Sequence, residues 1–449
     1  MTTAPLPAVN GTLESGKAGF RLSKDVQGAA IPAIPVARRW IERYLASPLA
    51  AQQQLIDVSQ GVPGTPPPPS LLSALALASS SPDSAKYGAI AGEAALRSLL
   101  ASEMRRLYGE EADLKAGDVA ISAGANLAFV SVIMCVCDPG DEVIIAVPWY
   151  FNQEQVLAMR GVTPVPLRTR AEDAFVPRVE EAEALITPRT KAITLVSPNN
   201  PTGAIYPPSL LAQFALLAKR KSIALILDET YRDFLGSAPH TLFSPSLASS
   251  SSEQGDELAE AGENWEWRKH LISLYSFSKS YAVPGHRLGA VVCGEEVMDQ
   301  VEKVLDCLQI CPPRAIQLAL VDQIPAMRTF VSSQAQTLAT RHAALKSVLP
   351  ARWKLAAQGG FFAYVHHPFP GKSSYEVCER LALELGVAGL PGTFFQPPEG
   401  RSFWGGVEKA REEDRWLRIG VANVGVETIR MLGGRLREAE ERWGWEMDE

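Results

Sequence analysis

The segment 271-LISLYSFSKSYAVPGHR-287 contains a short apolar run that is followed at once by two serines and a lysine. Leu271 to Tyr275 has apolar residues at both alternating positions, which is typical of a strand buried on both faces of a sheet. Ser276, Ser278 and Lys279 follow where this strand is expected to end. Ligands of open α/β sheets bind beyond the carboxyl ends of the strands. The segment therefore predicts a buried strand and a candidate site together.

Five further apolar runs of this kind occur along the chain. They are residues 119–121, 143–147, 192–196, 223–227 and 289–293. Helical patterns separate the runs, and strands that alternate with helices favour an α/β domain with a mostly parallel sheet. After about residue 323 the pattern changes to longer helices and a few strands, of which 360–365 is the clearest. This change predicts a second, smaller α+β domain.

The composition along the chain suggests where these domains begin and end. The start is rich in Ala, Gly and Pro, and an amphipathic stretch at 35–46 follows it. We expect four segments: a flexible N-terminal arm at 1–30, the N-terminal part of the small domain at 31–65, the large domain at 66–323 and the C-terminal small domain at 324–449.

One segment of the large domain, residues 244–263, has the composition of an insertion. It contains four consecutive serines and then five acidic residues without a basic one. A solvated surface loop is the simplest interpretation. A regulatory or partner-binding role is the alternative.

The overall composition excludes several classes of protein. The chain has 449 residues, 46% of them hydrophobic, and a formal net charge of −7, so it is neither a disordered chain nor a basic nucleic-acid binder. No apolar run approaches the roughly 20 residues that span a bilayer, and the first 20 residues do not resemble a secretory signal. We expect a cytoplasmic protein with no membrane or nucleic-acid partner.

The six cysteines are too few for a disulfide scaffold. Two pairs, Cys135 with Cys137 and Cys307 with Cys311, could be interpreted as parts of a metal site, but no other Cys or His lies at ligand spacing nearby. Buried, reduced thiols and no metal are the expectation.

Polar residues also follow four of the other apolar runs. They are Ser122–Asn126, Pro148–Tyr150, Ser197–Gly203 and Asp228–Tyr231. Each segment alone is commonplace, since turns and helix caps have the same composition. Together with Ser276–Lys279 they predict one site at the carboxyl edge of the sheet.

From Asp57 to Val424 the chain resembles the class I/II aminotransferases, which are fold-type I enzymes that use pyridoxal 5′-phosphate (PLP). The resemblance implies that the large domain binds PLP and that the enzyme exchanges an amino group between an L-amino acid and a 2-oxo acid through a Schiff base on Lys279. Another PLP reaction on this fold, such as C–S lysis, elimination or C–C bond formation, is the alternative. A non-catalytic ligand sensor is a third possibility, but nothing before Asp57 resembles the basic DNA-binding domain of such regulators.

The resemblance assigns catalytic roles to three residues. Lys279 matches the imine-forming lysine, a role that needs a primary amine, and the released amine can move a proton to and from the substrate. Asp228 matches the carboxylate that keeps the pyridine nitrogen protonated; read alone, it could be a helix cap. Tyr231 would bind the phenolic oxygen of the ring together with Asn200.

The remaining cofactor contacts are also assigned by the resemblance. The phosphate would lie at the start of a helix formed by Gly124, Ala125 and Asn126, where Ala125 replaces the Ser or Lys of many relatives. Three further groups complete this phosphate site: Ser276, Ser278 and Arg287. Tyr87 matches a tyrosine that reaches the phosphate from the neighbouring subunit, which implies a homodimer with shared sites. Tyr150 would stack on the ring, with Trp149 as the alternative.

Substrate binding is assigned to the smaller domain. Arg418 matches the arginine that holds the substrate α-carboxylate; a strand-edge arginine in a surface ion pair is the alternative. Gly61 and Asn200 match positions beside that carboxylate. The side-chain specificity stays open. Arg314 could pair with an acidic side chain or be a surface or interface residue. Phe361, Phe362, Phe394 and Phe395 could form an aromatic pocket or simply belong to the core.

Overall fold

The computed structural model describes residues 20–30, 33–245, 247, 264–397 and 414–448. Nearly all of the serine-rich acidic segment expected at 244–263 lies outside the described residues, as does the first part of the expected arm.

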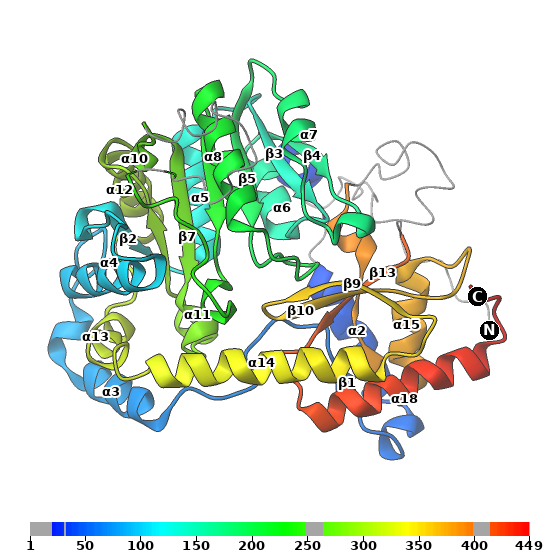
Figure 1. Ribbon diagram of the computed structural model, residues 1–449. Coiled ribbons are helices and arrows are strands. Elements are labelled where there is room, and N and C mark those ends of the chain that lie inside the picture. Colours follow the sequence, from blue (N-terminus) through cyan, green and yellow to red (C-terminus); the bar gives the residue numbers. More distant parts are fainter. Residues whose placement is uncertain (1–19, 31–32, 246, 248–263, 398–413, 449) are drawn as a thin grey trace.

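A seven-stranded sheet forms the centre of the larger part of the molecule (Figure 1). Its strands, in spatial order, are β2 (Val119–Ser122), β8 (Gly289–Val292), β7 (Leu271–Ser276), β6 (Ala224–Asp228), β5 (Thr190–Val196), β3 (Glu142–Val147) and β4 (Thr163–Arg168). Strand β8 runs antiparallel to both of its neighbours, β2 and β7, and the other neighbouring strands pair in parallel. The predicted mostly parallel α/β sheet is confirmed.

Alternate residues of the central strands enter two different cores. Ile144 and Leu225 belong to the core on one face of the sheet, and Val143, Ile145 and Ile226 belong to the core on the other. Helices cover both faces, so the strands are apolar at both alternating positions. The helices of this part are α3 (Pro69–Ser80), α4 (Ala94–Tyr108), α5 (Ala125–Val136), α6 (Phe151–Met159), α7 (Val179–Ala184), α8 (Pro208–Lys221), α10 (Trp267–His270), α11 (Phe277–Ser280), α12 (Glu295–Gln309) and α13 (Arg314–Gln323).

Strand β4 was not expected from the sequence. Pro164 and Pro166 lie within it, and proline cannot donate a hydrogen bond to a neighbouring strand. Of the described strands, β4 pairs only with β3, so it lies at an edge of the sheet and tolerates both prolines.

The smaller part of the molecule is built on antiparallel strands. Four of them pair in the order β12 (Leu390–Pro391), β13 (Trp416–Gly420), β10 (Phe362–His366) and β9 (Lys354–Gly359). In a separate two-stranded sheet, β1 (Ile56–Asp57) pairs in parallel with β11 (Val387–Ala388). The helices here are α2 (Ala33–Leu45), α14 (Arg328–Val348), α15 (Ser374–Leu385) and α18 (Val426–Trp443). Trp40 and Ile56 share one core with the carboxyl-terminal segments. The exact domain boundaries stay a prediction.

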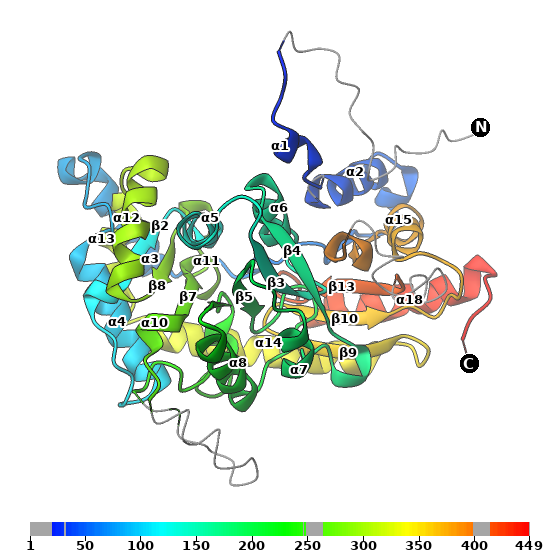
Figure 2. The ribbon, with the colours of Figure 1, turned by 90° about the horizontal axis from the view of Figure 1, so that it is seen from above.

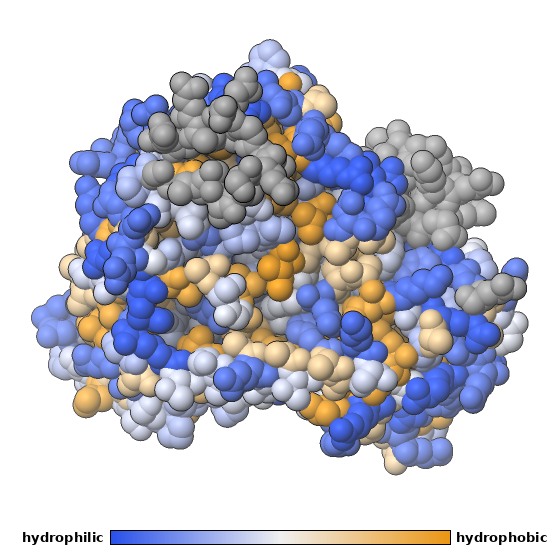
Figure 3. All heavy atoms as spheres, viewed as in Figure 1, coloured by the Kyte–Doolittle hydropathy of each residue, from blue (hydrophilic) through white to orange (hydrophobic). Residues whose placement is uncertain are grey.

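Helix α14 connects the two parts. It runs along the base of both in Figure 1 and packs against α18 on one side and against the turn Arg232–Phe234 on the other. Hydrophilic residues cover much of the outer surface in Figure 3, and hydrophobic residues gather in the hollow between the two parts.

A short helix, α1 (Lys24–Gly28), lies within the segment expected to be a flexible arm. It contacts α6 of the larger part (Figure 2). Across the described residues, no helix is both long and apolar enough to cross a membrane.

Candidate active site

A cavity of about 330 Å³ lies between the two parts of the molecule. This volume is at the lower end of the roughly 300–1,000 Å³ typical of small-molecule sites. Twelve of the fourteen residues assigned to the site by sequence line this cavity. They are Gly61, Ala125, Asn126, Tyr150, Asn200, Asp228, Tyr231, Ser276, Ser278, Lys279, Arg287 and Arg418.

Sheet topology brings these residues together, although they are far apart in the sequence. Strands β5, β6 and β7 are parallel neighbours, and Val196 pairs with Asp228, which pairs with Leu274. The segments that follow these strands therefore begin at the same edge of the sheet. Strand β13 of the smaller part closes the cavity with Arg418.

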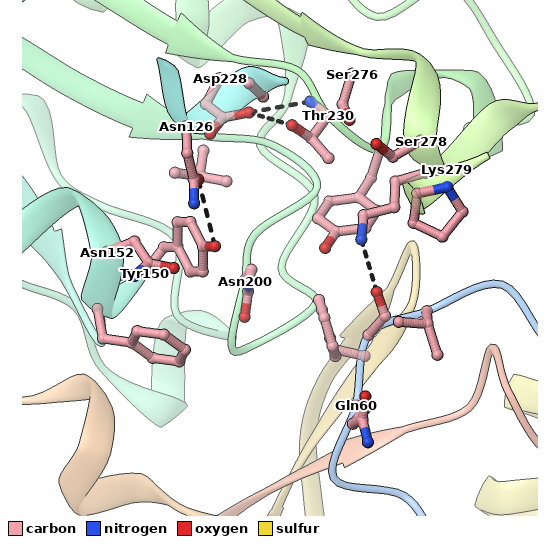
Figure 4. Close-up of a pocket in the computed structure, with 18 of the residues that line it drawn as sticks. Gln60, Asn126, Tyr150, Asn152, Asn200, Asp228, Thr230, Ser276, Ser278 and Lys279 are labelled. Atoms are coloured by element: carbon pink, nitrogen blue, oxygen red, sulfur yellow. Dashed lines mark hydrogen bonds between the residues drawn. The ribbon is translucent and has the colours of Figure 1, made fainter. Parts of the chain in front are cut away.

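Lys279 lies on the short helix α11 and points toward the segment that carries Gln60 (Figure 4). Its Nζ donates a hydrogen bond of 2.7 Å to the carbonyl oxygen of Gly61. Burial and the nearby guanidinium groups of Arg418 and Arg287 lower the pKa of Lys279 to about 8. A sizeable fraction of this amine is therefore neutral, and hence nucleophilic, near physiological pH.

Asp228 is buried at the end of β6 and accepts three hydrogen bonds. Thr230 donates through its backbone nitrogen (3.1 Å) and its Oγ1 (2.7 Å), and Gln153 donates through Nε2 (2.9 Å). Burial raises the pKa of Asp228, and the donors from Thr230 and Gln153 act in the opposite direction. A buried carboxylate of this kind gains from a positively charged ligand atom nearby.

Gln153 was missed by the sequence analysis. It is buried on α6, three residues after Tyr150. Residues three apart share one face of a helix, so the spacing from Tyr150 was the available signal.

The start of α5 forms an anion-binding corner. Gly124 caps the helix with a φ of +94°, and a Cβ at this position would collide with Nη2 of Arg287. The first N–H groups of a helix have no partner within it and attract anions. Arg287 itself adopts a left-handed backbone with a φ of +54°, a conformation that non-glycine residues adopt at an energetic cost, often at functional sites.

Tyr150, and not Trp149, faces the cavity. The hydroxyl of Tyr150 donates to Oδ1 of Asn126 at 3.4 Å (Figure 4). Trp149 is buried in one of the cores of the large sheet. Tyr231 lines another wall, where its ring packs 5.2 Å from that of Phe361, and burial raises its pKa.

Arg418 is buried, so the alternative of a surface ion pair is wrong. Its Nη1 donates to Oδ1 of Asn200 at 3.0 Å and its Nη2 to the carbonyl oxygen of Ser59. Its Nε has no hydrogen-bond partner within the described parts of the chain. The rings of Phe362 and Phe395 lie 4.5 and 5.1 Å from its Cζ, and burial lowers its pKa to about 10. A buried cation with an unused donor can bind an anionic ligand.

Gly124 and Tyr87 do not line the cavity. Gly124 is the N-cap residue of α5 and lies against the guanidinium of Arg287, which does line the cavity. The side chain of Tyr87 is 79% exposed, away from the cavity of its own chain. A role for Tyr87 in the site of a neighbouring subunit therefore stays a prediction.

Two other groups of candidate residues also lie outside the cavity. Arg314 forms an ion pair with Glu93 of the same chain, in which its Nε lies 2.6 Å from Oε1 of Glu93. All six cysteines are free, but Cys307 is exposed and Cys135 and Cys311 are only half-buried, so the expectation of burial was wrong for these three. Where the structure describes the chain, no cluster of three or more metal-ligating side chains occurs.

Comparison with known proteins identifies the family. The protein-family model for aminotransferase class I and II matches residues 53–436 of the chain. Arginine–pyruvate transaminase of Pseudomonas aeruginosa is 31% identical over 365 residues, which are 80% of this chain and 88% of that protein. Aspartate/prephenate aminotransferase of Thermus thermophilus is 30% identical over 69% of this chain and 76% of its own length.

Solved structures agree with this assignment. Aspartate aminotransferase from Thermus thermophilus with maleate superposes with a TM-score of 0.77 and 26% identity, over 93% of this chain and 99% of that one. The fold, the cavity and the sequence matches lead to one conclusion: the chain belongs to the class I and II aminotransferases and is a PLP-dependent transaminase.

Proposed function

We propose that this enzyme transfers the amino group of an L-amino acid to a 2-oxo acid in the cavity described above, with Lys279, Asp228 and Arg418 in the central roles. One observation carries the proposal. An amine with a lowered pKa and a buried arginine with an unused Nε open into the same cavity. The arginine can bind the α-carboxylate of an amino acid, and a neutral amine in the same cavity can act as the base for its Cα proton.

The cavity fits PLP at three points. The corner formed by Gly124 and Arg287 suits a phosphate, because it joins the free N–H groups of a helix start to a guanidinium group, which a side chain at Gly124 would displace. Asp228 suits a protonated ring nitrogen, and Lys279 suits an aldehyde. When bound, PLP supplies the carbonyl group that condenses with amines and the ring that withdraws electrons from the substrate Cα.

The residues of the chain then have separate tasks. The amine of Lys279 would take the proton from the substrate Cα and deliver it to the carbonyl carbon that PLP supplies, because burial keeps part of the amine neutral. Arg418 holds the α-carboxylate and thereby orients the Cα–H bond. Asn200 accepts a hydrogen bond from Arg418, so it fixes the orientation of the guanidinium group.

We further propose that the enzyme is a homodimer that acts in the cytosol. The exposed Tyr87 is available to a neighbouring subunit. Six free cysteines are typical of a reducing compartment.

An isotope-transfer experiment tests the function. The holoenzyme is incubated with an amino acid labelled at its amino nitrogen and with an unlabelled 2-oxo acid. We expect the label in the amino acid formed from the acceptor, and none with Lys279→Ala. Lys303→Ala, which removes an exposed lysine bonded to Gln300, is the matched control and should behave as wild type. Release of the label as ammonia would instead indicate an elimination reaction and contradict the proposal.

A further inference from the structure

The charges around the cavity bear on which amino acids it accepts. We propose that the site selects amino and oxo acids with uncharged, apolar side chains over those with a second carboxylate or a second cation. This inference rests on the proposed function, because it takes Arg418 as the partner of the α-carboxylate.

Three cations line the described part of the cavity, and each has a task in the proposed function. They are Lys279, Arg287 and Arg418. Arg287 lies over the start of α5, where the phosphate is expected, and Arg418 is paired with the α-carboxylate. Arg314, the other candidate for an acidic side chain, already pairs with Glu93. A second substrate carboxylate would therefore lose its hydration without gaining a partner from these residues, which is costly.

A substrate with a positively charged side chain is also disfavoured, because no carboxylate among the described lining residues is free to pair with it. Asp228 is the one carboxylate among the described residues that line the cavity, and it is committed to the cofactor ring. Its carboxylate already accepts hydrogen bonds from Thr230 and Gln153.

Apolar side chains form part of the walls beside the amine and the α-carboxylate. The ring of Phe362 packs so closely on Gly61 that a Cβ at Gly61 would collide with it, and the same ring lies against Arg418. Val62 follows Gly61, whose carbonyl oxygen accepts the hydrogen bond from Lys279. Ile34 of α2 also lines the cavity. A substrate held by Arg418 with its Cα near Lys279 therefore meets apolar side chains.

Two uncharged amides complete these walls. In Figure 4, Gln60 lies below Lys279, and Asn152 lies near Tyr150 on the other side of the cavity. Amides can bind a polar but uncharged group at the end of a side chain. They cannot neutralise a second charge, so they are consistent with a neutral substrate class.

Unreactive carboxylic acids test this selectivity by binding alone. Calorimetric titration of the holoenzyme would compare 3-phenylpropionate and 4-methylpentanoate with succinate and glutarate, none of which has an amino group to transfer. We expect the monocarboxylates to bind at least roughly tenfold more tightly, because a pocket discriminates by roughly tenfold or more even for one methylene. Equal or tighter binding of the dicarboxylates, for example through a cation from a second subunit, would overturn the inference.

Variants at Val62 test the position of the walls. Val62→Lys should reduce or reverse the preference for monocarboxylates, and Val62→Ala should weaken 3-phenylpropionate while succinate changes little. Met431→Lys adds the same charge at an exposed position of α18 outside the cavity and should leave the preference unchanged. An unchanged preference in both Val62 variants would overturn the assignment of this wall.

The isotope-transfer experiment separates the two proposals. Transfer that occurs only with dicarboxylic or dibasic donors would overturn the inference and leave the aminotransferase function intact. A clear preference for monocarboxylates without any amino transfer would support the inference about the walls and contradict the proposed function.

Discussion

Lys279 combines two properties that a solvated lysine does not have together. It is fixed by a hydrogen bond to the carbonyl oxygen of Gly61, and burial with two nearby guanidinium groups makes its charged form less favourable. An ordinary lysine has a pKa of about 10.4 and is almost fully charged at neutral pH. The local environment therefore decides the reactivity of this amine.

The lowered pKa predicts how the apoprotein takes up PLP at different pH. Only the neutral amine condenses with an aldehyde, so the initial rate should rise about tenfold per pH unit below pH 8 and level off above it. Stopped-flow absorbance between about pH 6.5 and 9.5 measures this rate. In Arg418→Ala the plateau should move to higher pH, because one of the groups that lower the pKa of Lys279 is gone. A rate that keeps rising throughout the wild-type series would contradict the prediction.

Arg418 gives the second prediction at this scale. Arg418→Ala should lower kcat/KM for all α-amino and 2-oxo acids alike, since each presents the same carboxylate. The loss of charge-assisted hydrogen bonds worth about 1.5–3 kcal/mol corresponds to at least a roughly tenfold decrease. A primary amine without a carboxylate is the control substrate, and its slow reaction should be unaffected. If only one substrate class suffered, Arg418 would select side chains and would not hold the α-carboxylate.

Helix α5 shows how one element prepares a binding corner before any ligand arrives. Its cap residue Gly124 has a positive φ and leaves the space that the Arg287 guanidinium occupies. Helix N-termini carry a partial positive charge as well as free N–H groups. The element thus supplies an anion site from its backbone, and the replacement of a polar residue by Ala125 removes only a side chain.

Gly124→Ala should therefore weaken PLP binding by at least roughly tenfold, because the methyl group displaces Arg287 and at least one charge-assisted bond is lost. Gly109→Ala is a matched control. Gly109 also has a positive φ, of +108°, but a Cβ there meets nothing within 4 Å. Both variants should lose similar thermal stability, measured by calorimetry, and only Gly124→Ala should lose cofactor affinity in a PLP titration. Equal affinities would exclude Gly124 from the phosphate corner.

At the scale of the whole molecule, the cavity depends on contact between the two parts. Arg418 comes from β13 of the smaller part and binds Asn200 of the larger part. Lys279 from the larger part binds Gly61, which precedes the described helices of the larger part in the sequence. Movement of one part against the other would change both contacts, and helix α14 packs against both.

A mixed-dimer experiment tests whether two chains share their sites. Tyr87→Phe should weaken the site of the partner subunit, and Lys279→Ala should inactivate the site of its own chain. A mixed dimer of the two variants then contains one site with both defects and one intact site. Mixing the variants after reversible dissociation should raise activity at limiting PLP, since a lost bond to a charged group costs about 1.5–3 kcal/mol.

The controls for this experiment follow from the same geometry. Each variant alone should show no rise after the same dissociation and mixing. If Tyr87 acted within its own chain, the mixed dimer would have one weak and one inactive site, and activity would not rise. A stable, active monomer in sedimentation would contradict the shared site directly.

The sequence by itself determined the fold class and the chemistry. Strands buried on both faces are mostly apolar at both alternating positions, and the reacting groups must be particular residue types, so both leave a local signal. Asp228 stands at the end of such a strand and Lys279 three residues after another, and the family and cofactor that they suggested are confirmed. Strand β4 was not predicted from the sequence, because its two prolines are typical of a loop.

Only the tertiary structure decided the environment of each group. Three contacts join segments far apart in the chain: the hydrogen bond from Arg418 to Asn200, the hydrogen bond from Gln153 to Asp228, and the ion pair between Arg314 and Glu93. The orientation of Tyr150 toward the cavity depends in the same way on what surrounds it. Burial, hydrogen bonding and nearby charge arise from contacts between distant segments, so no local pattern of residues encodes them.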